Sequence, residues 1–307
     1  MSELFDERLA DWKEQIDAEL KNILDSLEYA DEFKEILEYA LFPGGKRLRP
    51  ILLLEWHSVF SPPDEYALRY ACGIEILHSY SLIHDDMPCM DNDDLRRGKP
   101  TVHKKYGEGK ALLAGDALMD LAYRILNMPT PRGDASPFNL YPALCGDMGL
   151  INGQFIDLYG KINSLDDLVK MYRLKTGALI KLACVSGFML GNNLNYQSGD
   201  KFVGSLFGNY VKSVITDRAA PEDERMIKYV MASGFGEAFG CAFQLYDDIT
   251  EYIAGEKLSE TSALKFIDLE EAKIALNNHL NDAAKTLEIV GGDTEYLSEF
   301  LQKFVIV

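Results

Sequence analysis

The chain has 307 residues, of which 47% are hydrophobic, and its 49 acidic and 31 basic residues give a net charge of -18. A chain of this length and apolar content can bury a large core, and so negative a surface argues against nucleic acid as a partner. The five cysteines have no paired spacing, and the acidic N-terminus does not fit a targeting peptide. We therefore expect a cytoplasmic globular protein without a disulfide framework, and the hydrophobicity pattern predicts no membrane span.

Helical periodicity dominates the chain from its N-terminus onward. Apolar residues recur at three- and four-residue spacing over about 4–24, and a second helix is expected around 33–40. Pro43-Gly44-Gly45 then breaks the pattern, and a third helix is expected directly after Pro50, over 51–59. Further helices are predicted over 67–84, 112–126, 143–159, 165–191, 225–254 and 268–287, and the proline-rich stretch 129–142 is expected to be a loop. Strand signals are nearly absent, so the sequence predicts one all-α domain over 1–307, a bundle of about ten or more helices.

The densest polar feature is a cluster of five aspartates that follows the helix predicted over 67–84. Its members are Asp85, Asp86, Asp91, Asp93 and Asp94. Carboxylates this close repel one another unless a cation lies between them, and oxygen ligands of this kind suit Mg²⁺. A straight helix would separate Asp85 from Asp91 by about 600° of rotation, but Pro88 predicts a kink or helix end that brings Asp91 back. The alternative interpretation is a solvated acidic loop.

A second acidic cluster lies on the apolar helix predicted over 225–254. Asp247 and Glu251 are one helical turn apart and share a face, an arrangement that like charges disfavour unless a cation compensates them. Asp248 stands between them in the sequence. Two acidic clusters at the polar ends of apolar helices are typical of two sides of one multi-metal site.

Basic residues complete the pattern. The turn that precedes Pro50 carries three cations, Lys46, Arg47 and Arg49, and can hold an anion. Arg96 and Arg97 directly follow the first acidic cluster, and arginine can bind phosphate with two donors at once. Each basic residue alone is a weak signal, but together with the two carboxylate clusters they indicate a phosphorylated substrate.

Five sequence segments resemble the trans-isoprenyl diphosphate synthase (polyprenyl synthetase) family and occur in that family's order. They read GGKRLRP, IEILHSYSLIHDDMPCMDNDDLRRGKP, NGQFIDLYG, KTGALI and FQLYDD. The resemblance covers about 25–191 and 228–255 and is closest to bacterial farnesyl and geranylgeranyl diphosphate synthases. It implies the isoprenoid synthase fold, with helices around a central cavity, and a homodimer. It also implies a short-chain prenyltransferase that condenses isopentenyl diphosphate with dimethylallyl or geranyl diphosphate, using three Mg²⁺ ions held with the substrate diphosphate.

The resemblance also implies roles for individual residues. The implied metal ligands are Asp85, Asp86, Asp91, Asp247, Asp248 and Glu251. The implied binding residues for the allylic diphosphate are Arg96, Lys175, Thr176 and Gln244, and Lys257 would replace a lysine of the family from a displaced position. Those for isopentenyl diphosphate are Lys46, Arg49, His78 and Arg97, and Gln154 and Asp157 match a polar pair that faces the cavity. Asp85, Asp86, Arg96, Lys175 and Asp247 are the residues expected to carry catalysis.

Tyr80 is the residue expected to limit product length. It lies five positions before Asp85 on the same predicted helix, about 7.5 Å away along the axis. In the family that the chain resembles, an aromatic residue at this position accompanies short products, so farnesyl diphosphate is favoured over geranylgeranyl diphosphate. The alternative is that Tyr80 is ordinary helix packing.

Three features depart from the family's pattern. Glu251 stands where the family has aspartate, about 197–225 is an insertion, and the stretch after Glu251 is short, with Lys257 in place of the usual lysine. These departures leave open a weakly active or inactive synthase-like subunit that binds isoprenoid diphosphates. A terpene cyclase-like enzyme is a further alternative, but it would have no use for the isopentenyl diphosphate residues Lys46 and Arg49.

Overall fold

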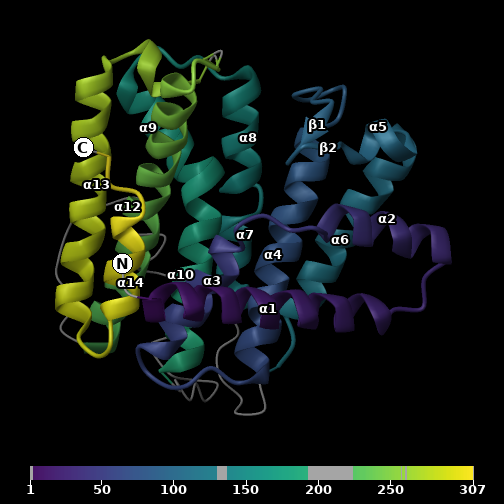
Figure 1. The fold of residues 1–307 in the computed structure, drawn as a ribbon, viewed down its shortest axis with the longest axis horizontal. Coiled ribbons are helices and arrows are strands. Elements are labelled where there is room, and N and C mark those ends of the chain that lie inside the picture. Colours follow the sequence, from purple (N-terminus) through teal and green to yellow (C-terminus); the bar gives the residue numbers. More distant parts are fainter. Residues whose placement is uncertain (1–2, 130–136, 193–223, 257, 260, 307) are drawn as a thin grey trace. The chain divides into compact units, whose positions relative to one another are not determined.

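The structure is a computed structural model that describes residues 3–129, 137–192, 224–256, 258–259 and 261–306. The contacts within the chain define two compact units, Met1–Leu54 with Pro63–Met128, and Glu55–Pro62 with Pro129–Val307. We call them unit 1 and unit 2. The described residues are almost entirely helical, which confirms the predicted all-α class (Figure 1). The prediction of a single domain is not tested by this division and stays a prediction.

Unit 1 is built around helix α4, which leads into the first acidic cluster. Its helices are α1 (Glu3–Asp25), α2 (Asp31–Leu41), the first part of α3 (Leu48–Ser58), α4 (Glu65–Asp85), α5 (Val102–Tyr106) and α6 (Glu108–Leu126). The Asp64 side chain caps α4 by accepting hydrogen bonds from the backbone N–H groups of Tyr66 and Ala67. Helix α4 packs along α6 and also contacts α1 and α2, so its residues are buried on most sides.

A short hairpin follows the first acidic cluster. Its strands β1 (Leu95–Arg96) and β2 (Lys99–Pro100) pair antiparallel, and the two residues of the turn, Arg97 and Gly98, have positive φ angles of 55° and 74°. Positive φ at both turn residues is the geometry that joins two strands most tightly. The sequence did not predict this hairpin because two-residue strands are too short to show alternation.

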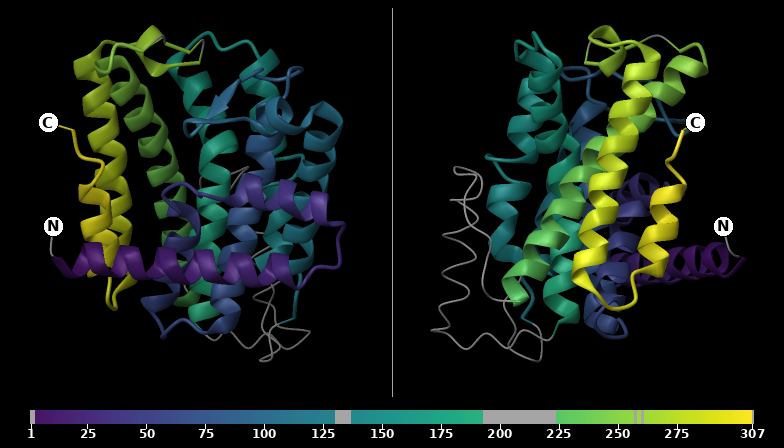
Figure 2. Two further views of the ribbon diagram at one scale, coloured as in Figure 1. Left: turned by 45° about the vertical axis from the view of Figure 1, so that its right-hand side comes forward. Right: turned by 90° about the vertical axis from the view of Figure 1, so that its left-hand side faces the viewer.

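Unit 2 contains the remaining helices. They are the end of α3, η1 (Pro137–Leu140), α7 (Tyr141–Leu144), α8 (Leu150–Tyr159), α9 (Leu165–Tyr172), the π-helical turn η2 (Arg173–Gly177), α10 (Ala178–Gly191), α12 (Glu224–Ile253), η3 (Ala263–Lys265), α13 (Leu269–Val290) and α14 (Glu295–Gln302). Helix α12 contacts both α10 and α13 along its length. Figure 2 shows α12 and α13 side by side in both views.

The C-terminal helix α14 was not predicted from the sequence. It is only eight residues long, but its Phe300 and the following Phe304 pack edge-on against Phe239 of α12, with ring centroids 5.1 and 5.0 Å away. These aromatic contacts bury much apolar surface and hold α14 against unit 2. So short a helix depends on tertiary packing more than on its own periodicity.

Two predicted helices are interrupted. The helix expected over 143–159 is broken between Leu144 and Leu150, because the chain turns so tightly that a Cβ on Gly149 would lie 1.8 Å from the Leu144 carbonyl oxygen. The helix expected over 165–191 is interrupted by η2, and part of the expected loop 129–142 is helical, in η1 and α7. The helices expected over 67–84, 112–126, 225–254 and 268–287 are confirmed as α4, α6, α12 and α13.

The structure also bears on the cysteines and on the most apolar segment of the chain. All five cysteines are free thiols, and four are buried, so the absence of a disulfide framework is confirmed. One segment, Leu165–Gly191, is long and apolar enough to cross a membrane by length and composition alone, which the sequence analysis did not expect. Since 83% of its most apolar window is buried inside the protein, this segment has the burial typical of a core helix.

Candidate active site

The first acidic cluster begins where α4 ends. Helix α4 stops at Asp85, and the backbone N–H of Asp91 then donates to the Asp85 carbonyl oxygen at 2.9 Å. Asn92, with a positive φ of 56°, completes the return of the chain. The predicted change of direction near Pro88 is therefore confirmed, and it takes the form of a helix end. Asp85, which is partly exposed, and Asp91, which is exposed, are carried on one compact turn.

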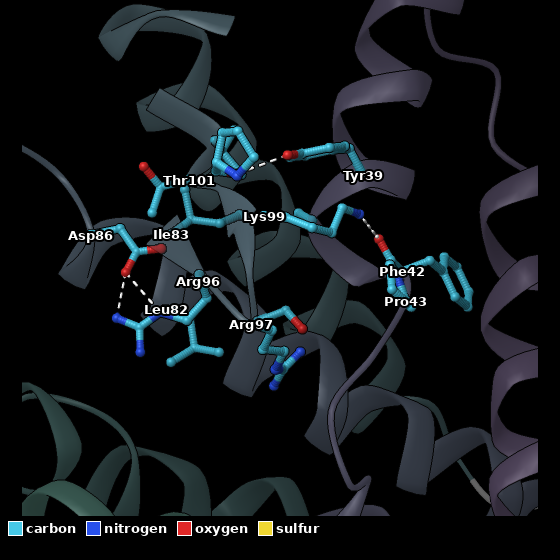
Figure 3. A pocket seen from close by; sticks show the side chains of 14 residues that line it. Tyr39, Phe42, Pro43, Leu82, Ile83, Asp86, Arg96, Arg97, Lys99 and Thr101 are labelled. Atoms are coloured by element: carbon cyan, nitrogen blue, oxygen red, sulfur yellow. Dashed lines mark hydrogen bonds and ion pairs between the residues drawn. The ribbon is translucent and has the colours of Figure 1, made fainter. Parts of the chain in front are cut away.

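Asp86 turns inward and pairs with Arg96. Its Oδ1 accepts from Arg96 Nε at 2.9 Å and from Nη2 at 2.5 Å, and Arg96 Nη2 also contacts Asp93 Oδ2 at 3.0 Å (Figure 3). Burial raises the pKa of Asp86 above its usual value, although the hydrogen bonds and charge of Arg96 oppose the shift. The carboxylate is 3% exposed, so its main contact is with the arginine that the resemblance assigns to the allylic diphosphate.

The basic turn before Pro50 presents two cations and buries the third. The Arg47 side chain is fully buried, where it donates to Asp17 Oδ1 at 2.8 Å, to Glu75 Oε1 at 2.6 Å and to the Leu41 carbonyl at 2.8 Å. A Cβ on Gly44 would lie 1.9 Å from the Arg47 guanidinium carbon, so only glycine fits there. The expectation of three anion-binding cations is therefore wrong for Arg47, whose charge is neutralised internally, while Lys46 is exposed.

Arg49, His78 and Arg97 lie in one region of unit 1. Arg49 Nη1 is 3.2 Å from His78 Nε2, and since arginine only donates, the imidazole nitrogen is the acceptor. Burial, followed by the charges of Arg49 and Arg97, holds the pKa of His78 well below its usual value. A Cβ on Gly45 would lie 2.7 Å from the Arg97 guanidinium, so Arg97 lies directly over this glycine. A neutral histidine beside two arginines leaves the positive charge of this region to the arginines, and such a region can hold an anion.

A small pocket, about 50 Å³ in volume and open in part to solvent, lies beside this region in unit 1. Figure 3 shows Asp86, Arg96, Arg97 and Lys99 among its lining residues. The Lys99 amine donates to the Phe42 carbonyl at 2.8 Å and lies 4.2 Å from the centre of the Tyr39 ring. These contacts hold Lys99 in place on the pocket wall.

Tyr80 is buried within α4, and its predicted role in limiting product length stays a prediction. Its side chain is 5% exposed, and its ring meets the His84 ring edge-on with centroids 5.8 Å apart. Both residues belong to the last turns of α4, just before Asp85.

In unit 2, Lys175 and Thr176 lie on the π-helical turn η2. Lys175 forms an ion pair with Asp157 of α8, and Thr176 Oγ1 donates to Gln244 Oε1 of α12 at 3.0 Å. Gln154, one turn before Asp157, is 8% exposed, and neither atom of its amide has a hydrogen-bond partner among the described residues. A buried amide in this state is costly unless a ligand or water satisfies it. The expectation that Gln154 and Asp157 form a polar pair facing the cavity stays a prediction.

The turn η2 is held between two helices by glycines, a feature that the sequence analysis missed. A Cβ on Gly153 of α8 would lie 2.3 Å from the Lys175 backbone nitrogen, and one on Gly240 of α12 would lie 2.4 Å from the Gly177 Cα. Both distances are too short for any side chain. Gly153 stands next to Gln154 in the NGQ segment, so its position was visible, but its contact with η2 was not. π-Helical turns occur often at functional sites, and this one carries Lys175.

In the second acidic cluster two carboxylates reach the surface and one is buried. Asp247 is partly exposed and Glu251 is exposed, and the two share one face of α12. Burial, followed by the charges of Asp248 and Glu256, raises the pKa of Glu251. Asp248 is 3% exposed and accepts from the Tyr172 hydroxyl at 2.5 Å and from the Ala263 backbone N–H at 2.7 Å. Tyr172 and the turn before η3 were missed by the sequence analysis, because no local pattern connects them with Asp248.

The donor set fits Mg²⁺ that is bound together with a phosphate ligand. Among the described residues no group of three or more histidine, cysteine, aspartate or glutamate side chains is placed to hold a metal ion alone. Mg²⁺ is commonly held by one or two carboxylates plus substrate phosphates and water. The turn carrying Asp85 and Asp91, and the pair of Asp247 and Glu251, each supply that number.

Two predicted features lie outside the described residues. Lys257 is one, and nearly all of the insertion at about 197–225 is the other. Their predicted roles stay predictions.

Comparisons with known proteins agree on one family. The sequence model of the polyprenyl synthetase family matches residues 30–288 of the chain. The farnesyl diphosphate synthase of Escherichia coli is 34% identical over 272 residues, 83% of this chain and 81% of that protein. Geranylgeranyl pyrophosphate synthase 7 of Arabidopsis thaliana is 32% identical over 281 residues, 85% and 72% of the two chains.

Among solved structures, an FPP/GFPP synthase from Zymomonas mobilis superposes with a TM-score of 0.80 at 30% identity, and the match covers 100% of both chains. This likeness confirms the predicted isoprenoid synthase fold. The chain belongs to the polyprenyl synthetase family and is a short-chain trans-prenyltransferase.

Proposed function

We propose that the protein is a farnesyl diphosphate synthase that condenses isopentenyl diphosphate with dimethylallyl or geranyl diphosphate. The observation that carries this proposal is in unit 1, where the carboxylate turn of Asp85 and Asp91 follows the helix that holds His78 among Arg49 and Arg97. This combination provides carboxylates for Mg²⁺ and cations for a second diphosphate. A cyclase would need only the first.

The reaction would begin with the allylic diphosphate. Its C–O bond breaks and the bonding electrons leave with the diphosphate, so negative charge grows on the departing oxygens. In the roles that the family resemblance implies, Arg96 and Lys175 would stabilise that charge, and Mg²⁺ would supply further electrostatic stabilisation when bound. Asp86 holds Arg96 in position through its two hydrogen bonds, and Asp157 does the same for Lys175 through an ion pair.

The second half of the reaction forms the carbon–carbon bond. Lys46, Arg49, His78 and Arg97 would hold isopentenyl diphosphate, whose double bond attacks the allylic cation. A proton is then lost from the new cation to the released diphosphate, which restores a double bond. Of the six carboxylates that the family resemblance implies for Mg²⁺, Asp85, Asp86, Asp91, Asp247 and Glu251 are proposed to bind it. The sixth, Asp248, is buried and accepts hydrogen bonds from the protein.

Tyr80 supports farnesyl diphosphate as the product because a buried ring in the last turns of α4 limits the room for a growing chain. Geranylgeranyl diphosphate is the alternative product, since relatives of similar identity carry both names. A cytoplasmic location is part of the same proposal.

We also propose that the protein forms a homodimer. On α8, Ile151, Phe155 and Tyr159 recur every four residues and are 48%, 61% and 64% exposed, and Met148, just before the helix, is 60% exposed. An uncharged apolar stripe of this kind on a protein of net charge -18 suits a second copy of the same face.

The test is a product assay with purified protein, Mg²⁺, isopentenyl diphosphate and either primer, with chain lengths read by mass spectrometry. We expect a fifteen-carbon product that is lost in Asp85→Ala. A twenty-carbon product would select the geranylgeranyl alternative. If folded protein elongates neither primer, the chain is an inactive synthase-like subunit, and the glutamate at 251 becomes the first position to revert to aspartate.

A further inference from the structure

A buried tyrosine hydroxyl joins three separate segments of unit 2. Tyr172, at the end of α9, is 2% exposed, and its hydroxyl lies 2.5 Å from Asp248 Oδ2 and 2.9 Å from the Thr261 carbonyl oxygen. Asp248 belongs to α12, and Thr261 belongs to the turn that precedes η3. One hydroxyl therefore connects the helix before Lys175, the helix of the second acidic cluster, and the chain that follows this helix.

The Asp248 carboxylate is occupied by protein donors on both oxygens. Oδ2 also accepts from the Ala263 backbone N–H at 2.7 Å, and Oδ1 lies 3.4 Å from Gln244 Nε2. The opposite end of the Gln244 amide accepts from Thr176 Oγ1 at 3.0 Å. An unbroken path of hydrogen bonds thus runs from Tyr172 through Asp248 and Gln244 to Thr176, next to Lys175.

Helix geometry explains why neighbouring acidic residues face different surroundings. Successive residues on a helix are about 100° apart, and residues four apart share a face. Asp248 shares its face with Gln244, which is turned toward η2, whereas Asp247 shares its face with the exposed Glu251. The second acidic cluster therefore presents two carboxylates outward and keeps one inside.

We propose that Asp248 is not a metal ligand but acts with Tyr172 as a positioning pair, which fixes Gln244 and Thr176 for the allylic diphosphate. The inference rests on the proposed function, because it assigns Gln244 and Thr176 to that substrate. The Asp248 carboxylate is 3% exposed and both of its oxygens accept from protein donors, so little of it is open to a hydrated Mg²⁺ ion. Asp247 is partly exposed and Glu251 is exposed on the same face of α12, and these are the carboxylates proposed to bind metal.

The experiment compares Tyr172→Phe, Asp248→Asn and Asp247→Asn for the KM of the allylic diphosphate and for the Mg²⁺ concentration at half-maximal rate. We expect Tyr172→Phe and Asp248→Asn to raise the allylic KM roughly tenfold, the size of one lost charge-assisted hydrogen bond, with the Mg²⁺ midpoint within about twofold. Asp247→Asn should shift the Mg²⁺ midpoint by about tenfold or more. The double variant Tyr172→Phe/Asp248→Asn should be no worse than the poorer single variant, because both remove one interaction.

Tyr252→Phe is the matched control, because Tyr252 is 47% exposed on the same helix. This variant should have the same allylic KM and the same Mg²⁺ midpoint as the unmodified protein. An Mg²⁺ midpoint that shifts as far in Asp248→Asn as in Asp247→Asn would show that Asp248 binds metal and overturn the proposal. An allylic KM in Tyr172→Phe equal to that of the unmodified protein would also overturn the proposal. Calorimetric titration of inorganic diphosphate with Mg²⁺ into the same variants measures the pair without turnover, so a chain that does not elongate primers still tests it.

Discussion

His78 shows how surroundings fix the charge of one residue. Burial and the nearby arginines lower its pKa in the folded protein well below the usual value of about 6.5, so it binds a proton more readily in the unfolded state. Stability that depends on this residue is fully present above about pH 6.5 and is lost as the pH falls below it. A neutral imidazole is also what the Arg49 contact requires.

We therefore expect the unmodified protein to lose more stability than His78→Gln between pH 7 and pH 5. Denaturant unfolding at several pH values measures the difference. Glutamine has no titrating group, and the remaining carboxylates and histidines titrate in both proteins. Equal losses in the two proteins would mean that His78 has an ordinary pKa.

Tyr80 allows a second prediction at the scale of one residue. Tyr80→Ala removes a buried ring five positions before Asp85 and leaves room in the last turns of α4. We expect products longer than fifteen carbons, detected by mass spectrometry. Phe60→Ala is a control, since that ring belongs to unit 2 and packs on Phe188. An unchanged product distribution in Tyr80→Ala would mean that other residues set the length.

Glycines set the geometry of elements around the turn η2. Gly153→Ala would place a Cβ 2.3 Å from the Lys175 nitrogen, and the backbone of η2 cannot yield as a flexible side chain would. We expect a loss of about 1–3 kcal/mol in the free energy of unfolding, as in overpacked cores, together with a lower kcat/KM from displaced Lys175. Thermal unfolding and the elongation assay measure both effects.

Gly109→Ala is the matched control at this scale. Gly109 lies in the first turn of α6, and a Cβ there would meet nothing within 4 Å. Alanine favours helix over glycine by up to about 1 kcal/mol, so this variant should be as stable as the unmodified protein or more stable, with the same activity. Full activity in Gly153→Ala would show that η2 tolerates displacement.

Among the elements, those with long amphipathic or apolar runs were predictable. Helices α4, α6, α12 and α13 followed from spacing alone, because periodicity over many residues leaves one way to bury the apolar face. The break before α8, the π-helical turn and α14 did not, because each depends on a close approach to segments distant in the sequence. The same limit hid the hairpin that carries Arg96 and Arg97.

At the scale of the whole molecule, metal binding should depend on phosphate. Since the described residues contain no group of three or more His, Cys, Asp or Glu side chains placed to hold a metal, Mg²⁺ by itself should change the melting temperature little. Mg²⁺ with inorganic diphosphate should stabilise the fold, by about 2.7 kcal/mol at a hundredfold excess over the dissociation constant. Differential scanning calorimetry measures the shift.

Asp85→Ala should abolish that stabilisation, while Asp282→Ala, on the exposed face of α13, should preserve it. An equal shift with Mg²⁺ alone would contradict the prediction, because it would require a metal site made of protein ligands only.

The apolar stripe on α8 predicts the oligomeric state. Phe155→Glu places a charge in the stripe and should convert the dimer to a monomer in sedimentation analysis. Ile274→Glu is the control, because Ile274 is 60% exposed on α13 and lies outside the stripe. A protein that is monomeric without any substitution would refute the proposed homodimer.

The amino-acid sequence by itself determined the helical class and the strings of residues that we propose to bind metal and diphosphate. These features are local: a period, a run of aspartates before two arginines, a glycine-rich basic turn. Tertiary structure decided which members of each string face outward. Arg47 is turned into an internal ion network while Lys46 is exposed, and Asp248 meets Tyr172 while Asp247 does not. The physical reason is that burial and hydrogen bonding depend on partners far away in the chain, which neighbouring residues of similar chemistry do not reveal.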